Sequence, residues 1–278
     1  MTTATLVGAD EVAAFAEAVA TAADRTLAPP AEPWRPGAAQ DDRVPALSAA
    51  LAAIGWPDVA GDAALLPLAA PAGRVLGARL APLADLDTLL GASPLAGDLV
   101  RHGAERAVDA AGAQHAVVRA EPVAYGDALG VHRVLELRPA GRVDETALAA
   151  WIAASTGYLA GLSGWALALV LEHVQGRRAF GGTLAALAPV QQRLADAATA
   201  TRGLELLAGD IPGRAALAHA GVAAQDVTAA CQQVVGAIGF TLEFPLQRGY
   251  RRARAAALWA DALLTPPPSR PPARPAPA

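Results

Sequence analysis

The feature that most constrains the fold is a run of twenty residues without a charged side chain, from Ile152 to Leu171. Such a run is long enough to cross a bilayer, and a helix that is apolar all round is either a membrane span or the centre of a helical bundle. The run also contains three Gly, two Ser and one Thr, and it continues into the polar sequence EHVQGRR in the same helical phase. No second run of this kind follows, so we expect a buried helix of a soluble protein and no membrane span.

Helix signals dominate the rest of the chain. Alanine, the strongest helix former, makes up much of the 54% hydrophobic content, and the 4% aromatic content disfavours a large sandwich or barrel. Asp144 is a suitable cap for a helix that runs through the apolar segment to about Gln175. Further long helices are expected at 183–209, at 223–239 and after Pro245, and four long helices with short links describe an antiparallel bundle.

Shorter helices are expected in the N-terminal third. Asp10 can cap the first of them, and the apolar spacing predicts helices over 11–28, 44–58 and 72–91. The Pro-rich stretch 29–37 predicts an extended connection between the first two.

Strand patterns occupy only a small central part of the chain. Residues 114–127 and 132–139 alternate apolar with polar side chains, which predicts two short strands, too few for an independent sheet domain. We therefore expect a shortened N-terminal helical region, a remnant β region, a helical bundle and a disordered Pro-rich tail, at residues 1–99, 100–143, 144–264 and 265–278.

Charge, cysteine and histidine usage exclude several kinds of site. The net charge of −4 argues against a nucleic-acid partner. The single Cys231 excludes an internal disulfide and suits a reducing cytoplasm, and the five His residues lack the spacing of a metal site. No secretory signal opens the chain, so we expect a cytoplasmic protein. Ser163 lies between glycines inside the apolar run, and a nucleophile elbow would need a strand-to-helix turn.

Two segments carry motifs, EHVQGRRAFGGTLAALAPVQQRLAD at 172–196 and CQQVVGAIGFTLEFPLQRGYRRAR at 231–254. Both resemble signatures of the acyl-CoA dehydrogenase family, an Arg-x-x-Phe-Gly motif and a Gln-x-x-Gly-Gly-x-Gly motif that leads to an Arg-Asp pair. The residues in register are Arg177, Phe180, Gly181, Gln192, Leu194, Ala195 and Asp196, then Gln233, Gly236, Gly239, Phe240, Glu243, Phe244, Pro245 and Arg251. The sequence departs from the second motif at Ala237, which replaces a Gly, and at Arg252, which replaces the Asp.

The resemblance implies FAD as the cofactor. In this family the positions of Arg177, Phe180, Gln233 and Gly236 reach across a dimer interface to the adenine and pyrophosphate end of the neighbour's FAD. An Arg suits a pyrophosphate because its guanidinium is a rigid fork of donors. From the residues alone, Arg177 could equally cap a turn, and Gln233 could be a surface residue before a C-cap Gly.

The catalytic base of the family is missing from this chain. In the family a Glu abstracts the α-proton of the acyl thioester while a hydride passes to the flavin, and counting from the motifs places it at Ala260 or at about Trp151. Neither side chain can accept a proton. Asp261 is one residue from the first position, about 100° around a helix, and is the alternative base. A further family Gln aligns with Ala188.

The resemblance therefore implies a mainly α, acyl-CoA dehydrogenase-like fold and an incomplete enzyme. Chains of this kind resemble the non-catalytic subunits of heteromeric actinobacterial steroid side-chain acyl-CoA dehydrogenases, heterotetramers with two copies of each of two chains. The expected role is to hold the ADP end of the FAD of a catalytic acyl-CoA dehydrogenase partner, which would bind the acyl-CoA. Two alternatives stay open: a stand-alone scaffold without flavin, and a self-sufficient homo-oligomer that uses Asp261.

Overall fold

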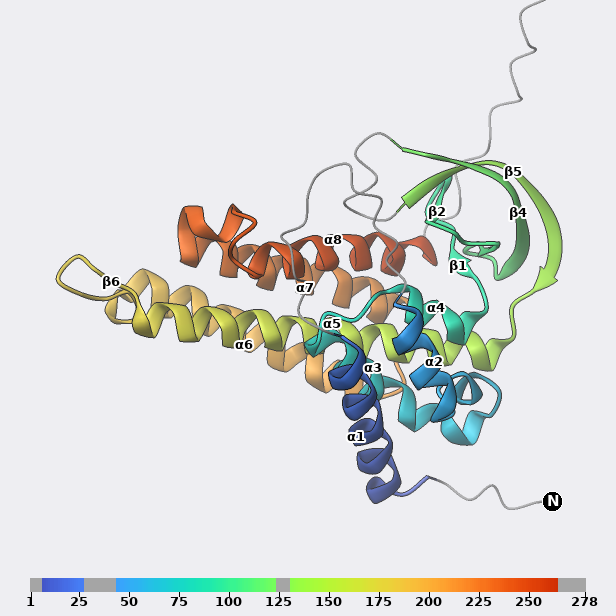
Figure 1. Ribbon diagram of the computed structural model, residues 1–278, viewed down its shortest axis with the longest axis horizontal. Helices are drawn as coiled ribbons and strands as arrows, with labels where there is room; N and C mark the ends of the chain where they lie inside the picture. Colours follow the sequence, from blue (N-terminus) through green and yellow to red (C-terminus); the bar gives the residue numbers. More distant parts are fainter. Residues whose placement is uncertain (1–6, 28–43, 124–130, 265–278) are drawn as a thin grey trace, which may run out of the picture.

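The computed structural model describes residues 7–27, 44–123 and 131–264, and the chain is shown in Figure 1. The connection predicted at 29–37 and the tail predicted at 265–278 lie outside the described residues. The described part is mainly helical, as expected, with a small sheet at one end of a helical bundle.

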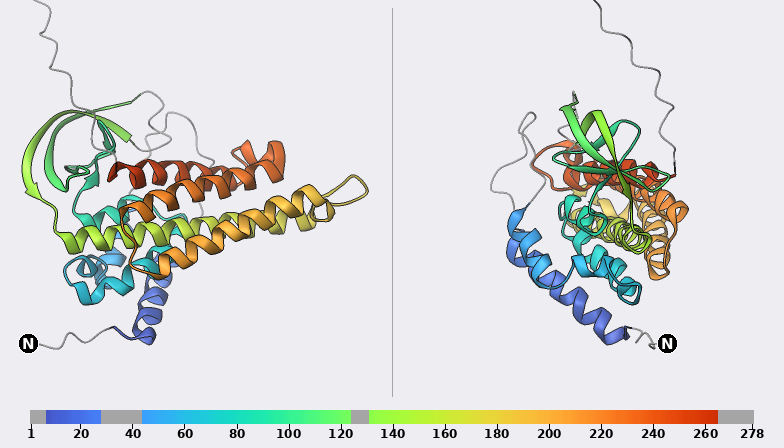
Figure 2. Two further views of the ribbon diagram at one scale, coloured as in Figure 1. Left: turned by 180° about the vertical axis from the view of Figure 1, so that it is seen from behind. Right: turned by 90° about the vertical axis from the view of Figure 1, so that its right-hand side faces the viewer.

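The apolar run forms the middle of a long helix, α5 (Glu145–Gly176), around which the other helices pack (Figure 2). Asp144 caps it as predicted, because its carboxylate accepts hydrogen bonds from the backbone N–H groups of Thr146 and Ala147 at 2.9 and 3.1 Å. Every residue from Ala150 to Ser163 is buried. This helix is long and apolar enough to cross a membrane, but 67% of its most apolar window is buried inside the fold. It is the core helix of the bundle.

The C-terminal bundle is completed by α6 (Ala188–Gly209), α7 (Arg214–Val235) and α8 (Leu246–Ala262). Three boundaries differ from the expectation. Helix α6 begins later, with Pro189 in its first turn, after a short 3-10 turn, η4 (Leu184–Ala186). Helix α7 begins earlier and ends before Gly236, whose φ of +71° ends the helix. A second 3-10 turn, η5 (Gly236–Phe240), then leads toward α8.

The N-terminal part contains α1 (Ala9–Thr26), α2 (Pro45–Ala53), α3 (Ala69–Ala78) and α4 (Ala84–Leu90), with the 3-10 helices η1 (Pro57–Ala60) and η2 (Ala63–Leu68). The single helix predicted at 72–91 is wrong. The chain breaks between α3 and α4, where Leu80 adopts a φ of +52° and Pro82 follows, and only the end at Gly91 is as expected.

The predicted cap of the first helix is also wrong. Gly8 is the N-cap residue, and Asp10 lies in the first turn. The Glu11 side chain, at the third helical position, accepts the N–H of the N-cap residue Gly8 at 2.8 Å, which is one half of a capping box.

Helix α3 lies against α5 with the two backbones in contact. An added side-chain carbon on Gly73 or Gly77 would lie 2.0 Å from the carbonyl oxygen of Ala154 or Tyr158. The reverse holds on α5, where an added carbon on Gly157 or Gly161 would lie 2.0 Å from the carbonyl oxygen of Ala70 or Arg74. Only glycine permits this approach, so these four positions set the distance between the N-terminal helices and the bundle.

Five strands form one sheet in the order β1-β3-β4-β5-β2, where the sequence predicts two. The two predicted strands are the long antiparallel pair β4 (Ala113–Pro122) and β5 (Val131–Arg142). The other three are β1 (Ser93–Pro94), β2 (Leu99–Arg101) and β3 (Arg106–Val108), each too short to show an alternating pattern. The sheet lies at the end of the bundle where α5 begins (Figure 1).

Arg214 ties the sheet to the bundle. From the first turn of α7 its guanidinium donates to the carbonyl oxygen of Ala110, between β3 and β4, and to that of Leu263 just after α8, the second at 3.3 Å. The sheet therefore holds a defined position beside the start of α5.

Candidate functional site

The two positions expected for a catalytic base are both buried. Trp151 lies near the start of α5 and Ala260 near the end of α8. Ala260 faces Gly221 of α7, where its Cβ lies 3.0 Å from the point at which a side chain on that glycine would begin. Asp261, the alternative base, is exposed on α8. The structure therefore puts Ala260 and Asp261 on different faces of one helix.

Trp151 belongs to a buried polar cluster at the junction of four elements. Arg101 of β2 forms a two-fold ion pair with Asp87 of α4, and the two side chains are only 8% and 14% exposed. The Trp151 indole N–H donates to Asp87 Oδ1 at 3.1 Å. The Arg101 guanidinium carbon also lies 5.0 Å from the ring centroid of Trp259 on α8, within the range of a cation–π contact. We call these four residues the Asp87–Arg101 cluster.

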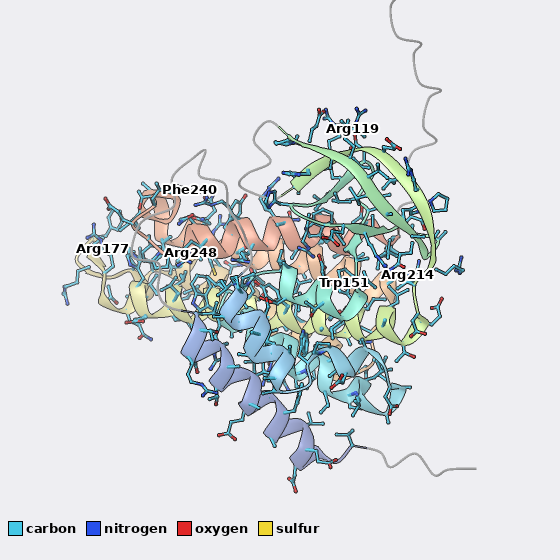
Figure 3. The ribbon with its side chains drawn as sticks, turned by 45° about the vertical axis from the view of Figure 1, so that its right-hand side comes forward. Arg119, Trp151, Arg177, Arg214, Phe240 and Arg248 are labelled. Carbon is cyan, nitrogen blue, oxygen red and sulfur yellow. The ribbon has the colours of Figure 1, made fainter. Side chains whose placement is uncertain are left out.

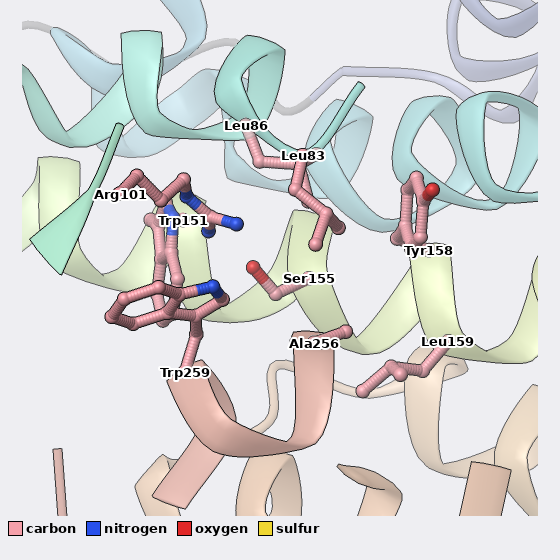
Figure 4. A pocket seen from close by; sticks show the side chains of 9 residues that line it. All are labelled: Leu83, Leu86, Arg101, Trp151, Ser155, Tyr158, Leu159, Ala256 and Trp259. Atoms are coloured by element: carbon pink, nitrogen blue, oxygen red, sulfur yellow. The ribbon is translucent and has the colours of Figure 1, made fainter. Parts of the chain in front are cut away.

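The side chains of the cluster and their neighbours leave little free space between them. The cavity that remains measures about 10 Å³ (Figure 4). Its described lining is Leu83, Leu86, Arg101, Trp151, Ser155, Tyr158, Leu159, Ala256 and Trp259. A cavity of this size on this measure is at the lower limit for one water molecule, roughly 10–15 Å³. Pockets that bind ligands of drug size are far larger, roughly 300–1,000 Å³.

The sequence contained no signal for Asp87 and Arg101. They lie 14 residues apart, and Asp87 lies 64 residues from Trp151. Neither residue belongs to a recognisable motif, because the cluster is assembled from a helix end, a three-residue strand and two long helices.

The predicted cofactor residues Arg177 and Phe180 lie at the far end of α5. Arg177 ends the helix with its side chain exposed, and its N–H bonds to the carbonyl oxygen of His173 at 2.9 Å. A hairpin follows, formed by β6 (Arg178–Ala179) and β7 (Gly182–Thr183), and it projects beyond the bundle (Figure 1). Phe180 and Gly181 form its turn with φ of +54° and +82°, and the Phe180 side chain is 89% exposed.

Gln233 and Gly236, the other two predicted cofactor residues, lie at the end of α7. Gln233 is exposed, and no atom of the described residues lies within 4 Å of the point at which a side chain on Gly236 would begin. The segment after them exposes Ile238, Phe240 and Leu242. Arg177 and Phe240 lie at the same end of the bundle, away from Trp151 (Figure 3).

The four predicted cofactor residues therefore lie far from the Asp87–Arg101 cluster. Along α5, Trp151 and Arg177 are separated by about 39 Å at the usual rise of an α-helix. The chain thus has a pocket of about 10 Å³ near the start of α5 and an exposed, partly apolar surface at the other end of the bundle.

Between the two ends, one face of α8 concentrates positive charge. Burial lowers the pKa of the Arg248 guanidinium, and repulsion from Arg252 lowers it further. The pKa of Arg251 is lowered by burial and then by repulsion from Arg248. Arg252 also donates to the carbonyl oxygen of Ala81 at 3.0 Å, which fixes it beside the break between α3 and α4. Such a concentration of guanidinium groups attracts anions.

The Phe180 turn is strained, and this gives a testable prediction. A bulky residue in the left-handed region costs roughly 1–2 kcal/mol, whereas Asn-Gly is the preferred sequence for a two-residue turn with both φ positive. Phe180→Asn is therefore expected to raise the free energy of unfolding of the free chain by about 1 kcal/mol, as measured by urea titration. Phe240→Asn is the control, because Phe240 is also exposed but has no positive φ. Equal shifts for the two variants would contradict the strain.

Comparison with known proteins points to one fold. The family described as "Acyl-CoA dehydrogenase, C-terminal domain" matches residues 142–260. A steroid acyl-CoA dehydrogenase, the G363A variant of Tcur3481-Tcur3483, is similar in structure with a TM-score of 0.62 and 19% identity, over 92% of this chain and 96% of that one. No curated protein is significantly similar in sequence.

Two further solved structures have the same fold. The ChsE4-ChsE5 complex from Mycobacterium tuberculosis gives a TM-score of 0.60 at 14% identity, over 93% of this chain and 95% of that one. A glutaryl-CoA dehydrogenase from Mycobacterium smegmatis in complex with FADH2 gives 0.65 at 14% identity, over 95% and 94%.

Proposed function

We propose that this chain, which has the acyl-CoA dehydrogenase fold, is the non-catalytic subunit of a heteromeric FAD-dependent acyl-CoA dehydrogenase. The premise is that residues 142–260 belong to the C-terminal domain of that family. The complete enzyme would desaturate an acyl-CoA thioester between Cα and Cβ. This chain would hold the ADP end of the FAD that its partner uses.

One contrast carries the proposal: the pocket at the start of α5 is too small for a cofactor, whereas the four motif residues at the other end of the bundle are accessible. The cavity of about 10 Å³ beside Trp151 has no room for an isoalloxazine ring or an acyl chain. Arg177, Phe180 and Gln233 are exposed, and Gly236 leaves the space beside it open for a ligand to approach. These residues would hold one end of a dinucleotide and leave its flavin end to another chain.

The partner proposed is a catalytic acyl-CoA dehydrogenase chain. Two of the similar structures are named as pairs of chains, Tcur3481-Tcur3483 and ChsE4-ChsE5, and the first is called a steroid enzyme. By analogy, this chain would form a heterotetramer with two copies of each chain and act on a steroid side chain, in the cytoplasm. The exposed Phe180, Ile238 and Phe240 beside the motif residues are suited to contact with such a chain.

A bound FAD would supply the hydride acceptor of the reaction, and the residues of this chain would position that cofactor. The Arg177 guanidinium would donate to the pyrophosphate oxygens, and the Gln233 amide would hydrogen-bond the nucleotide. Neither residue would touch the reacting carbons. The base would come from the partner, since position 260 is an alanine here.

Flavin content tests the proposal, measured as visible absorbance of the full chain purified alone and of the chain co-expressed with a candidate catalytic acyl-CoA dehydrogenase chain from the same organism. A colourless chain that co-elutes with its partner as a yellow complex is the expected result. Flavin bound by the chain alone would refute the shared site and favour a self-sufficient enzyme. A colourless complex would favour a scaffold without flavin.

The same complex tests Arg177 directly. Arg177→Ala is expected to weaken flavin retention at least tenfold, because a hydrogen bond to a charged group is worth roughly 1.5–3 kcal/mol. Arg178→Ala is the matched control: Arg178 is the neighbouring exposed arginine and occupies a variable position of the motif. Flavin occupancy after dialysis is the measurement. Equal occupancy in the two variants would remove Arg177 from the site.

A further inference from the structure

The small pocket beside Trp151 contains two polar atoms that have no hydrogen-bond partner among the described residues. These are the hydroxyl oxygen of Ser155, on α5, and the indole nitrogen of Trp259, on α8. Both residues are more than nine-tenths buried, and both line the cavity of about 10 Å³. Figure 4 shows the two atoms directed toward the same space, next to the Arg101 guanidinium. Buried polar groups in folded proteins almost always have a hydrogen-bond partner, so two unpaired polar atoms around one cavity indicate a bound ligand.

Size and charge limit what that ligand can be. The cavity has room for one small molecule, about the size of a water. Asp87 neutralises the charge of Arg101, because the two side chains form a bidentate ion pair. The pocket therefore offers no net charge to hold an ion. The lining offers an indole donor, a hydroxyl that can donate or accept, and a guanidinium. A buried water forms about three hydrogen bonds to groups of this kind.

We propose that this pocket binds one water molecule between Trp259 Nε1, Ser155 Oγ and the Arg101 guanidinium. The water completes the hydrogen bonding of the junction where β2, α4, α5 and α8 meet. The pocket is then a structural part of the chain. This inference rests on the geometry of the cavity and not on the proposed function, so either can fail alone.

The sign of a serine substitution tests the proposal. If the water is bound, Ser155→Ala removes one of its partners and is expected to lower the free energy of unfolding. If the cavity is dry, the same change removes an unpaired hydroxyl and leaves stability unchanged or higher. Ser163→Ala is the matched control, since Ser163 is a buried, unpaired serine on the same helix that does not line the cavity. The gain in helix propensity is equal for both variants.

A double-mutant cycle with Trp259→Phe extends the test. The effects of Ser155→Ala and Trp259→Phe on stability are expected to be non-additive. The unfolding equilibrium constant of the double variant should be about three- to tenfold smaller than the sum of the two single effects predicts. Ser163→Ala combined with Trp259→Phe is expected to be additive. A stabilising Ser155→Ala, or an additive cycle for Ser155 and Trp259, would overturn the proposal.

A measurement on the unmodified chain tests the water without relying on the stability of a variant. In an NMR experiment the Trp259 indole proton is expected to show a cross-peak to a long-lived water. Its signal is assigned by its loss in Trp259→Phe or by selective labelling. Absence of this cross-peak, with the indole proton itself observed, would equally overturn the proposal.

Discussion

Replacing Gly77 with alanine is expected to prevent the chain from folding stably. The new Cβ would lie 2.0 Å from the backbone carbonyl oxygen of Tyr158, a distance that real Cβ atoms essentially never show. Both atoms belong to helix backbones, so neither can rotate away, and α3 would have to move from α5. That movement would also strain the hydrogen bond of 2.7 Å that the Tyr158 hydroxyl donates to the carbonyl oxygen of Ala81.

The expected loss is more than about 4 kcal/mol, the range reached only by severe packing defects. A domain has only about 5–15 kcal/mol of stability in total. Urea unfolding monitored by far-ultraviolet circular dichroism gives the free energy, and the yield of soluble protein gives a first indication. Gly157→Ala is expected to behave like Gly77→Ala, because its Cβ would meet the carbonyl oxygen of Ala70 at 2.0 Å.

Gly164→Ala is the control for this prediction. Gly164 lies on α5 close to Gly161, but no atom lies within 4 Å of its missing side chain. An alanine there should stabilise the helix by up to about 1 kcal/mol. The same substitution is thus expected to lower stability at Gly157 and to raise it at Gly164, although both glycines lie on α5. Similar stability of the Gly77→Ala and Gly164→Ala variants would show that the two backbones are not in contact.

Replacing Arg101 with leucine is expected to cost about 3–5 kcal/mol, the usual effect of removing one partner of a buried ion pair. The Asp87 carboxylate, 14% exposed, would lose a two-fold partner and keep its bond from Trp151. Trp259 would lose its cation–π contact. Urea unfolding measures the change. Arg101→Lys should recover only part of it, because an ammonium cannot form the two-fold contact.

Two comparisons make this result specific. Arg138→Leu removes an exposed partner of Glu136 and is expected to cost less than about 1 kcal/mol. The double variant Arg101→Leu, Asp87→Leu should be more stable than Arg101→Leu alone, since no charge then stays buried without its partner. A double variant as unstable as the single one would mean that Arg101 contributes through packing and not through its charge.

Much of the helical architecture could be predicted from local patterns. The cap at Asp144 and the burial of the run from Ile152 follow from residues adjacent in sequence, and the structure confirms both. The motif residues Arg177 and Gln233 could be recognised for the same reason, since each lies in a short segment with fixed spacing. Whether they contact flavin stays a prediction.

Other parts of the fold could not be predicted because their signals are too short or too weak. Strands of two or three residues show no period, so β1, β2 and β3 were missed. The break between α3 and α4 depends on Leu80, which adopts a positive φ against its own preference. Surrounding packing overrides the local tendency there.

The sequence by itself determined most of the long helices, that the run from Ile152, buried in the structure as far as Ser163, belongs to a core helix, and which family the C-terminal segments resemble. These properties depend on residues three or four positions apart in the sequence, because helix formation and the burial of one helix face are determined by neighbouring residues. Only the tertiary structure decided that Asp87, Arg101, Trp151 and Trp259 meet and close a pocket. Those contacts depend on how close α3 approaches α5 and where the sheet sits, and no local pattern records the distance between two elements.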